Sequence, residues 1–173
     1  ILLSSASPAI TGNTISNNGN GIQCNNNSNP AITGNKFEGN TSYAMYFDVT
    51  STGAVISGNT VSGSYAAIYI SSGTIASNVT WSSTNLPYVI SGAVTVSEGV
   101  TLTIAPGARV KLGPPGYPLY INGTLIADGT DAQKIIFTSD NDDTVGGDTN
   151  GDGNATSPAA GNWYGMVFNP TSK

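Results

Sequence analysis

A five-residue motif that recurs at nearly constant spacing constrains the fold more than any other feature of this sequence. It reads Ala-Ile-Thr-Gly-Asn at residues 9–13 and again at 31–35, and related segments occupy 55–59 and 74–78. Successive copies begin 22, 24 and 19 residues apart. A repeat of this length is typical of a solenoid, in which each coil buries its apolar face against the next. The alternative, ordinary turn asparagines in a β-sandwich, does not explain a motif that recurs in register.

Each motif contains a bend. Ile10 and Ile15 are five residues apart, so in a straight strand they would face opposite sides. A bend at Gly12 and Asn13 lets both point inward, because Gly and Asn tolerate the left-handed conformation. We therefore expect one asparagine per coil to stack, with each side-chain amide bonded to the coils above and below. The expected ladder comprises Asn13, Asn35, Asn59 and Asn78, beside an aliphatic core row of Ile10, Ile32, Ile56 and Ile75.

The second half of the chain consists of shorter apolar segments with alternating polarity. Glycine-containing turn signals separate these segments, and helical periodicity is lacking. The sequence thus predicts an all-β, right-handed parallel β-solenoid of roughly seven to eight coils, counted at about 22 residues each. We expect one continuous domain over 1–173, made of ladder coils (1–79), narrower coils (80–138), an inserted loop (139–162) and a last strand (163–173).

The repeats carry a family resemblance. The four motif copies resemble the right-handed parallel β-helix repeats of the pectate-lyase-like superfamily. The second half is similar to a module of secreted archaeal and bacterial surface β-helix proteins, some of them described as related to disaggregatase. The matching segments are 80–81, 88–92, 99–107, 122–130, 136–139 and 163–165. The resemblance implies the fold rather than a function, because such repeats serve sugar-degrading enzymes, adhesins and surface layers alike.

Composition excludes several functions and favours an extracellular location. Five Lys and Arg stand against ten acids, so nucleic-acid binding is not expected. Histidine is absent, which excludes a His-based triad. No apolar run approaches the length of a membrane span, and the single cysteine excludes a disulfide scaffold. The first residues lack an initiator Met and a signal peptide, so we expect an internal or processed piece whose open, uncapped ends present strand edges.

An acidic, glycine-rich segment is the best candidate for binding a metal. Residues 148–154 carry oxygen donors at alternate positions and a glycine at the sixth, as at the start of a calcium loop. The twelfth position is Ala159, so this is not an EF-hand, and other carboxylates would have to complete the shell. We expect calcium as a cofactor, and the alternative is a solvated loop without metal. The candidate ligands are Asp140, Asp142, Asp143, Asp148, Asn150, Asp152 and Asn154.

No residue is assigned a catalytic role. Arg109 and Lys111 alternate on one strand and are expected to form a solvated face. The Asp142–Asp143 pair lies in a loop, and nothing holds Glu38 and Asp48 at the separation that glycoside hydrolysis needs.

Tyr46 and Tyr69 occupy similar places in successive coils, where they predict either an external stack that contacts glycans or ordinary cross-strand packing. The sequence therefore favours a non-enzymatic building block of a surface layer, sheath or filament. Such a block would stack end to end on copies of itself or on flanking coils. A carbohydrate-binding or adhesive module that contacts surface polysaccharide is the second hypothesis. A fragment of a polysaccharide-degrading lyase or hydrolase is the third.

Overall fold

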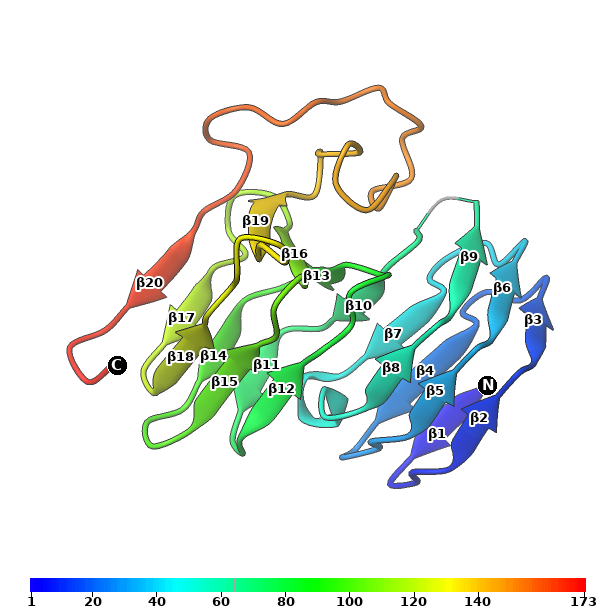
Figure 1. Ribbon diagram of the computed structural model, residues 1–173, viewed down its shortest axis with the longest axis horizontal. Coiled ribbons are helices and arrows are strands. Elements are labelled where there is room, and N and C mark those ends of the chain that lie inside the picture. The colour runs from blue at the N-terminus through cyan, green and yellow to red at the C-terminus, as the bar shows by residue number, and fades with distance from the viewer. Residues whose placement is uncertain (64) are drawn as a thin grey trace.

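Short parallel strands make up almost all of the regular structure. The computed structural model describes residues 1–63 and 65–173. In this part of the chain twenty strands pair only in parallel, and one 3-10 helix, η1 (Val49–Ser51), interrupts them (Figure 1). Backbone hydrogen bonds between coils lie in the sheets, while glycines and asparagines form the bends between them. The expectation of an all-β parallel solenoid is confirmed.

One sheet runs the whole length of the solenoid. Its strands, in spatial order, are β1 (Leu2–Ser4), β4 (Ile22–Asn25), β7 (Met45–Phe47), β10 (Ile68–Ile70), β13 (Tyr88–Ile90), β16 (Arg109–Leu112) and β19 (Ile136–Ser139). We call it the long sheet.

The other two faces are each divided into an N-terminal and a C-terminal sheet. On one face, β2 (Ala9–Thr11), β5 (Ala31–Thr33) and β8 (Val55–Ser57) are followed by β11 (Gly73–Ile75), β14 (Val94–Val96), β17 (Leu119–Ile121) and β20 (Met166–Phe168). On the other face, β3 (Thr14–Ser16), β6 (Lys36–Glu38) and β9 (Thr60–Ser62) are followed by β12 (Val79–Trp81), β15 (Thr101–Ile104) and β18 (Thr124–Ala127).

The described strands complete about six turns, fewer than the seven to eight expected from the repeat length. A coil consists of one strand from each face, and β18 ends the sixth set of three. The expected number was too high because residues 140–165, between β19 and β20, contain no strand. This segment is longer than one repeat, yet it lies outside the stack.

The division of the face that contains β8 and β11 occurs at η1. Asp48 caps this helix, because its side chain accepts a hydrogen bond from the backbone N–H of Thr50. Strand β11 of the next coil contacts η1, and a Cβ on Gly73 would lie 2.6 Å from the Val49 side chain. Strand β11 of the fourth coil thus packs on η1 instead of pairing with β8. Only the long sheet, through the pairing of β7 with β10, continues across this point.

Stacked apolar side chains fill the inside of the solenoid. In the long sheet Cys24, Phe47 and Ile70 occupy successive register positions and are fully buried or nearly so. Ile10, Ile32 and Ile56 form the expected row on a second face, whereas Ile75 belongs to the C-terminal sheet and continues instead into Val96 and Ile121.

An asparagine ladder joins the first three coils at the bend between the second and third faces. The Asn35 Oδ1 accepts hydrogen bonds from the backbone N–H and Nδ2 of Asn13, at 2.9 and 3.2 Å. The Asn59 Oδ1 accepts the same pair from Asn35, at 3.0 and 3.1 Å. Asn35 and Asn59 are almost completely buried. Each also donates from Nδ2 to the carbonyl of an isoleucine in the preceding coil, Ile10 and Ile32 respectively.

Asn78 follows a different pattern. Its Oδ1 accepts a hydrogen bond from the backbone N–H of Thr101 on the next coil at 2.8 Å, and its side chain is exposed. The ladder of direct asparagine contacts therefore has three members in the described residues, rather than the four expected. The reason is the division at η1, which leaves β8 and β11 unpaired.

Candidate metal centre and tyrosine pocket

The inserted loop (residues 139–162), from here on called the acidic segment, lies against the outer face of the long sheet. In Figure 1 the chain between β19 and β20 passes beside β16, β13 and β10. Tyr69 on β10 donates from its hydroxyl to the carbonyl of Thr149, and Tyr65 donates its backbone N–H to the carbonyl of Asp148 at 3.1 Å. These bonds join residues about eighty positions apart in the sequence. The segment therefore covers outward-facing side chains that would otherwise meet solvent.

Lys111 is one of the covered side chains. It points outward from β16, as expected, but it is completely buried rather than solvated. Its Nζ donates to the carbonyl of Gly147 and to the Thr149 hydroxyl, both at 2.8 Å. Burial lowers the pKa of Lys111, and the nearby carboxylate of Asp140 opposes this effect only in part. The expectation of a solvated Arg109–Lys111 face is therefore wrong for Lys111, which anchors the acidic segment to the sheet.

Asp140 and Asp142 are engaged in hydrogen bonds with threonines. The Asp140 carboxylate accepts from the Thr149 hydroxyl at 2.6 Å, yet burial raises the pKa of Asp140. Asp142 accepts from the hydroxyls of Thr138 and Thr144, at 2.7 and 2.6 Å. For Asp142, hydrogen bonds from these threonines outweigh the effect of burial and lower its pKa. Both carboxylates thus support the local fold of the segment.

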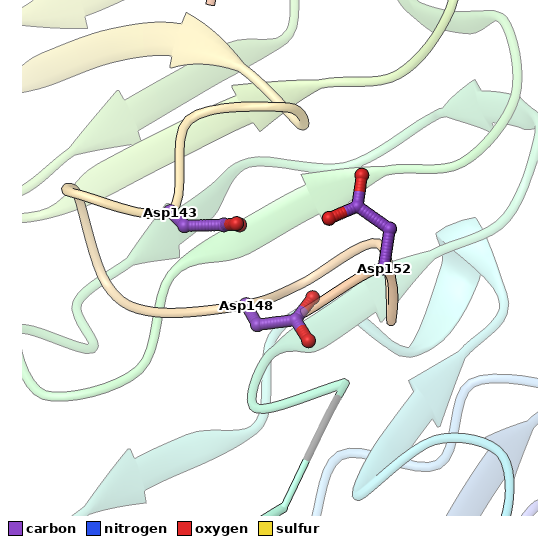
Figure 2. Close-up of side chains that lie close together, drawn as sticks. All are labelled: Asp143, Asp148 and Asp152. Carbon is purple, nitrogen blue, oxygen red and sulfur yellow. The ribbon is translucent and has the colours of Figure 1, made fainter. Parts of the chain in front are cut away.

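Three other carboxylates converge on one point. Each of Asp143, Asp148 and Asp152 offers an oxygen, and these oxygens lie within 4.8 Å of one another (Figure 2). Asp148 accepts from the backbone N–H groups of Gly151 and Gly153, at 2.6 and 3.0 Å. The glycines permit this tight turn, since both have positive φ. The backbone of the segment thereby brings the first and fifth positions of the motif together.

Asp143 has no compensating donor among the described residues. Both of its carboxylate oxygens are buried and lack a hydrogen-bond partner there. Burial raises the pKa of Asp143, and the charges of Asp148 and Asp152 raise it further. A buried carboxylate without a donor is costly, whereas a divalent cation bound to the three carboxylates would remove this cost.

The two candidate asparagines have different surroundings. The Asn150 side chain donates to Asp152 Oδ2 at 2.9 Å and accepts from the Asp152 backbone N–H at 3.2 Å, so it braces the turn. Asn154 has a positive φ and donates its backbone N–H to Asp152 at 3.0 Å. Of the five predicted aspartate ligands, the structure brings together the carboxylates of Asp143, Asp148 and Asp152, while those of Asp140 and Asp142 bond to threonines.

Tyrosines form a second cluster on the same face. Tyr46 and Tyr69 are register partners on β7 and β10, as the sequence suggested. Tyr69 is only 3% exposed, because the acidic segment and Tyr43 cover it. Burial and the Asp140 charge raise its pKa, so its hydroxyl stays protonated. Tyr69 therefore does not present a free ring face to a glycan, while Tyr46 is half-buried and stacks on Tyr43 with ring centroids 5.3 Å apart.

A pocket of about 350 Å³ lies between the tyrosines and the acidic segment. Tyr43, Tyr65, Tyr69 and Tyr117 line it on the sheet side, and Asp140, Thr149 and Asn150 line it on the other. Sequence reasoning missed this pocket, because the docking of residues 140–150 onto β10 is a long-range contact without a local pattern.

Sequence reasoning also missed a second, shorter asparagine ladder. Asn40 Oδ1 accepts from the backbone N–H of Asn18 at 3.1 Å. A signal was available in this case, since Asn18 and Asn40 are 22 residues apart, the same spacing as the main motif.

Two family models match the chain. A right-handed β-helix region covers residues 1–99, and a pectate-lyase-like β-helix domain covers residues 73–167. The chain belongs to the right-handed β-helix family. No curated protein and no solved structure matches it significantly. A β-helix of this kind is compatible with an enzyme and with a non-catalytic protein, so membership alone decides the fold and not the activity.

None of the described helices is long and apolar enough to span a membrane.

Proposed function

We propose that this β-helix is a non-enzymatic extracellular structural module, a building block of a surface layer, sheath or filament. The observation that carries the proposal is the stack itself, in which side-chain ladders, backbone pairing and a continuous apolar core join each coil to the next. Two of the acids considered for catalysis, Glu38 and Asp48, have structural partners. Glu38 pairs with Lys36, and Asp48 caps η1 while accepting from the backbone N–H of Asn26 at 2.6 Å.

Calcium bound by Asp143, Asp148 and Asp152 is part of this proposal. Calcium prefers carboxylate oxygens at about 2.3–2.6 Å, so two ligands on one ion lie up to about 5 Å apart. The 4.8 Å limit among these three carboxylates suits such an ion. The buried, donor-free oxygens of Asp143 supply the second argument. The ion would hold the acidic segment, which Lys111 and Tyr69 already anchor, against the long sheet.

Thermal unfolding with and without calcium tests the metal site. A ligand at about 100 times its Kd stabilises a protein by about 2.7 kcal/mol, which for a chain of this size raises the Tm by about 5–11 °C. We expect Asp143→Asn to abolish this rise, and Asp131→Asn, an exposed acid outside the segment, to retain it. An equal Tm in calcium and in EDTA for the unaltered protein would mean that calcium does not stabilise this fold.

Assembly by continued strand pairing is the second part of the proposal. At one end of the long sheet, β1 pairs only with β4 among the described strands, so its other edge is open to a further strand there. The partner would be a further β-helix coil, supplied by flanking residues or by another copy of the chain. Electron microscopy of the native material tests this directly. Rods or sheets with a regular solenoid repeat are expected, and isolated particles of one length would contradict assembly.

Ligand binding at the tyrosine pocket is a second candidate function. Aromatic rings beside carboxylate and amide groups are a suitable surface for a sugar ring, and the volume of about 350 Å³ is at the small end of known ligand pockets. This reading makes the chain a carbohydrate-binding or adhesive module. Tyr117→Ala should weaken binding in a glycan pull-down, while Tyr164→Ala, an exposed tyrosine that does not line the pocket, should not.

A further inference from the structure

The walls of the tyrosine pocket are suited to a positive charge. The face of a tyrosine ring attracts a cation within about 6 Å of its centroid. Tyr43 and Tyr65 meet almost at right angles, with centroids 5.7 Å apart and an interplanar angle of 81°. Tyr69 packs against Tyr43 at 4.2 Å, and Tyr117, which is 39% exposed, completes the lining. Four tyrosine rings in several orientations thus border one small volume.

The polar groups of the pocket reinforce this preference. Asp140 contributes a carboxylate and Asn150 an amide, and none of the described lining residues is a lysine or an arginine. Lys111 lies close to Asp140, but its ammonium group donates to Gly147 and Thr149 beneath the segment. Burial, the neighbouring tyrosines and the Asp140 charge raise the pKa of Tyr43, so the phenol stays neutral. The pocket therefore combines neutral aromatic rings with an anionic group.

Tyr65 shows that the pocket wall is held in an unfavourable backbone conformation. Its φ is 62°, in the left-handed region that bulky residues rarely adopt. Its backbone N–H bonds to the Asp148 carbonyl, and its ring occupies the space next to Gly151, where a Cβ would lie 2.5 Å from the ring. Strain that neighbouring contacts maintain is characteristic of binding sites. The acidic segment thus positions the Tyr65 ring at the pocket.

We propose that this pocket binds a small organic cation through its ammonium group, with an amino-sugar residue or a quaternary ammonium compound as the ligand. This inference rests on the second candidate function and narrows its ligand to a cationic one. The ring faces would contact the alkyl or pyranose carbons next to the nitrogen. The Asp140 carboxylate would balance the charge.

Matched pairs of cationic and neutral compounds test the inference. Choline and its uncharged isostere 3,3-dimethylbutanol have the same shape, and glucosamine and glucose differ at one amine. We expect each cation to bind at least about tenfold more tightly than its neutral partner, measured by chemical-shift titration in calcium. Choline tighter than glucosamine would identify a quaternary ammonium ligand, and the reverse order would identify an amino sugar.

Two variants connect the preference to named residues. Asp140→Asn keeps an acceptor for Thr149 but removes the charge, so it should lower the affinity for choline and leave that for dimethylbutanol unchanged. Tyr117 is exposed and lies outside the hydrophobic core clusters, so Tyr117→Ala should fold normally. It should weaken the binding of choline at least about fivefold, whereas Tyr164→Ala should not. Equal binding of glucose and glucosamine would overturn the cation inference and leave carbohydrate binding standing. Failure of all four compounds to bind the folded protein would overturn both.

Discussion

The asparagine ladder predicts that two Asn→Ala substitutions lower the free energy of unfolding by very different amounts. Asn35→Ala removes a buried side chain that takes part in four hydrogen bonds, two through Oδ1 and two through Nδ2. At about 1 kcal/mol net for each bond, the loss is about 3–4 kcal/mol. Asn13→Ala removes only the two hydrogen bonds that Nδ2 of this exposed residue donates. The backbone N–H of residue 13 keeps its bond to the Asn35 side chain in this variant. Its cost should stay below about 1 kcal/mol.

Urea unfolding followed by far-ultraviolet circular dichroism measures this difference. Both variants should unfold with an unchanged m-value, because neither alters the surface that unfolding exposes. In thermal unfolding, the Tm of Asn35→Ala should fall by about 6–16 °C, and that of Asn13→Ala by a few degrees at most. Equal losses, or a loss below about 1 kcal/mol for Asn35→Ala, would refute the view that the buried ladder stabilises the coil stack.

Further substitutions test other parts of the structure. Gly123→Ala should prevent stable folding, because its Cβ would lie 2.2 Å from two backbone oxygens, while Gly19→Ala, with open space around it, should be nearly neutral by thermal unfolding. Asp48→Asn should cost about 1 kcal/mol at neutral pH. Hydrogen bonds from Asn26, Ser51 and Thr50 outweigh burial and lower the pKa of Asp48, so this stabilisation is present above the unfolded-state pKa and disappears as the pH falls through the folded-state value. A cost in urea unfolding that is the same at acid and neutral pH would contradict the assignment. Lys111→Met should release the acidic segment, seen as faster proteolysis within 139–162 without loss of the core circular dichroism signal.

Much of the coil structure was predictable, because the motif carries its own register. Ile10 and Ile32 stack because both precede the same Gly-Asn bend, and the 22-residue spacing places one above the other. The division at η1 was not predictable in this way. It depends on how Asp48 caps a single turn and on how Val49 fills the space next to Gly73, and neither contact changes the repeat pattern.

The candidate site was only partly predictable, for a related reason. Alternating aspartates and glycines signal a tight turn of oxygen donors, which is why Asp148 and Asp152 were recognised together. The docking of that turn onto the sheet is a matter of tertiary packing. Alternation correctly placed Tyr69 and Lys111 on the outer face, but it gave no sign that residues 147–149 would cover them.

Amide hydrogen exchange with and without calcium tests most directly whether a metal locks the acidic segment onto the solenoid. We expect calcium to slow exchange of the Gly151 and Gly153 amides, which bond to Asp148, and of the Tyr65 amide, which bonds to the segment. Amides in β4 and β5, far from the site in the stack, should be unaffected. Equal exchange of these amides in calcium and in EDTA would mean that no metal holds the segment against the solenoid.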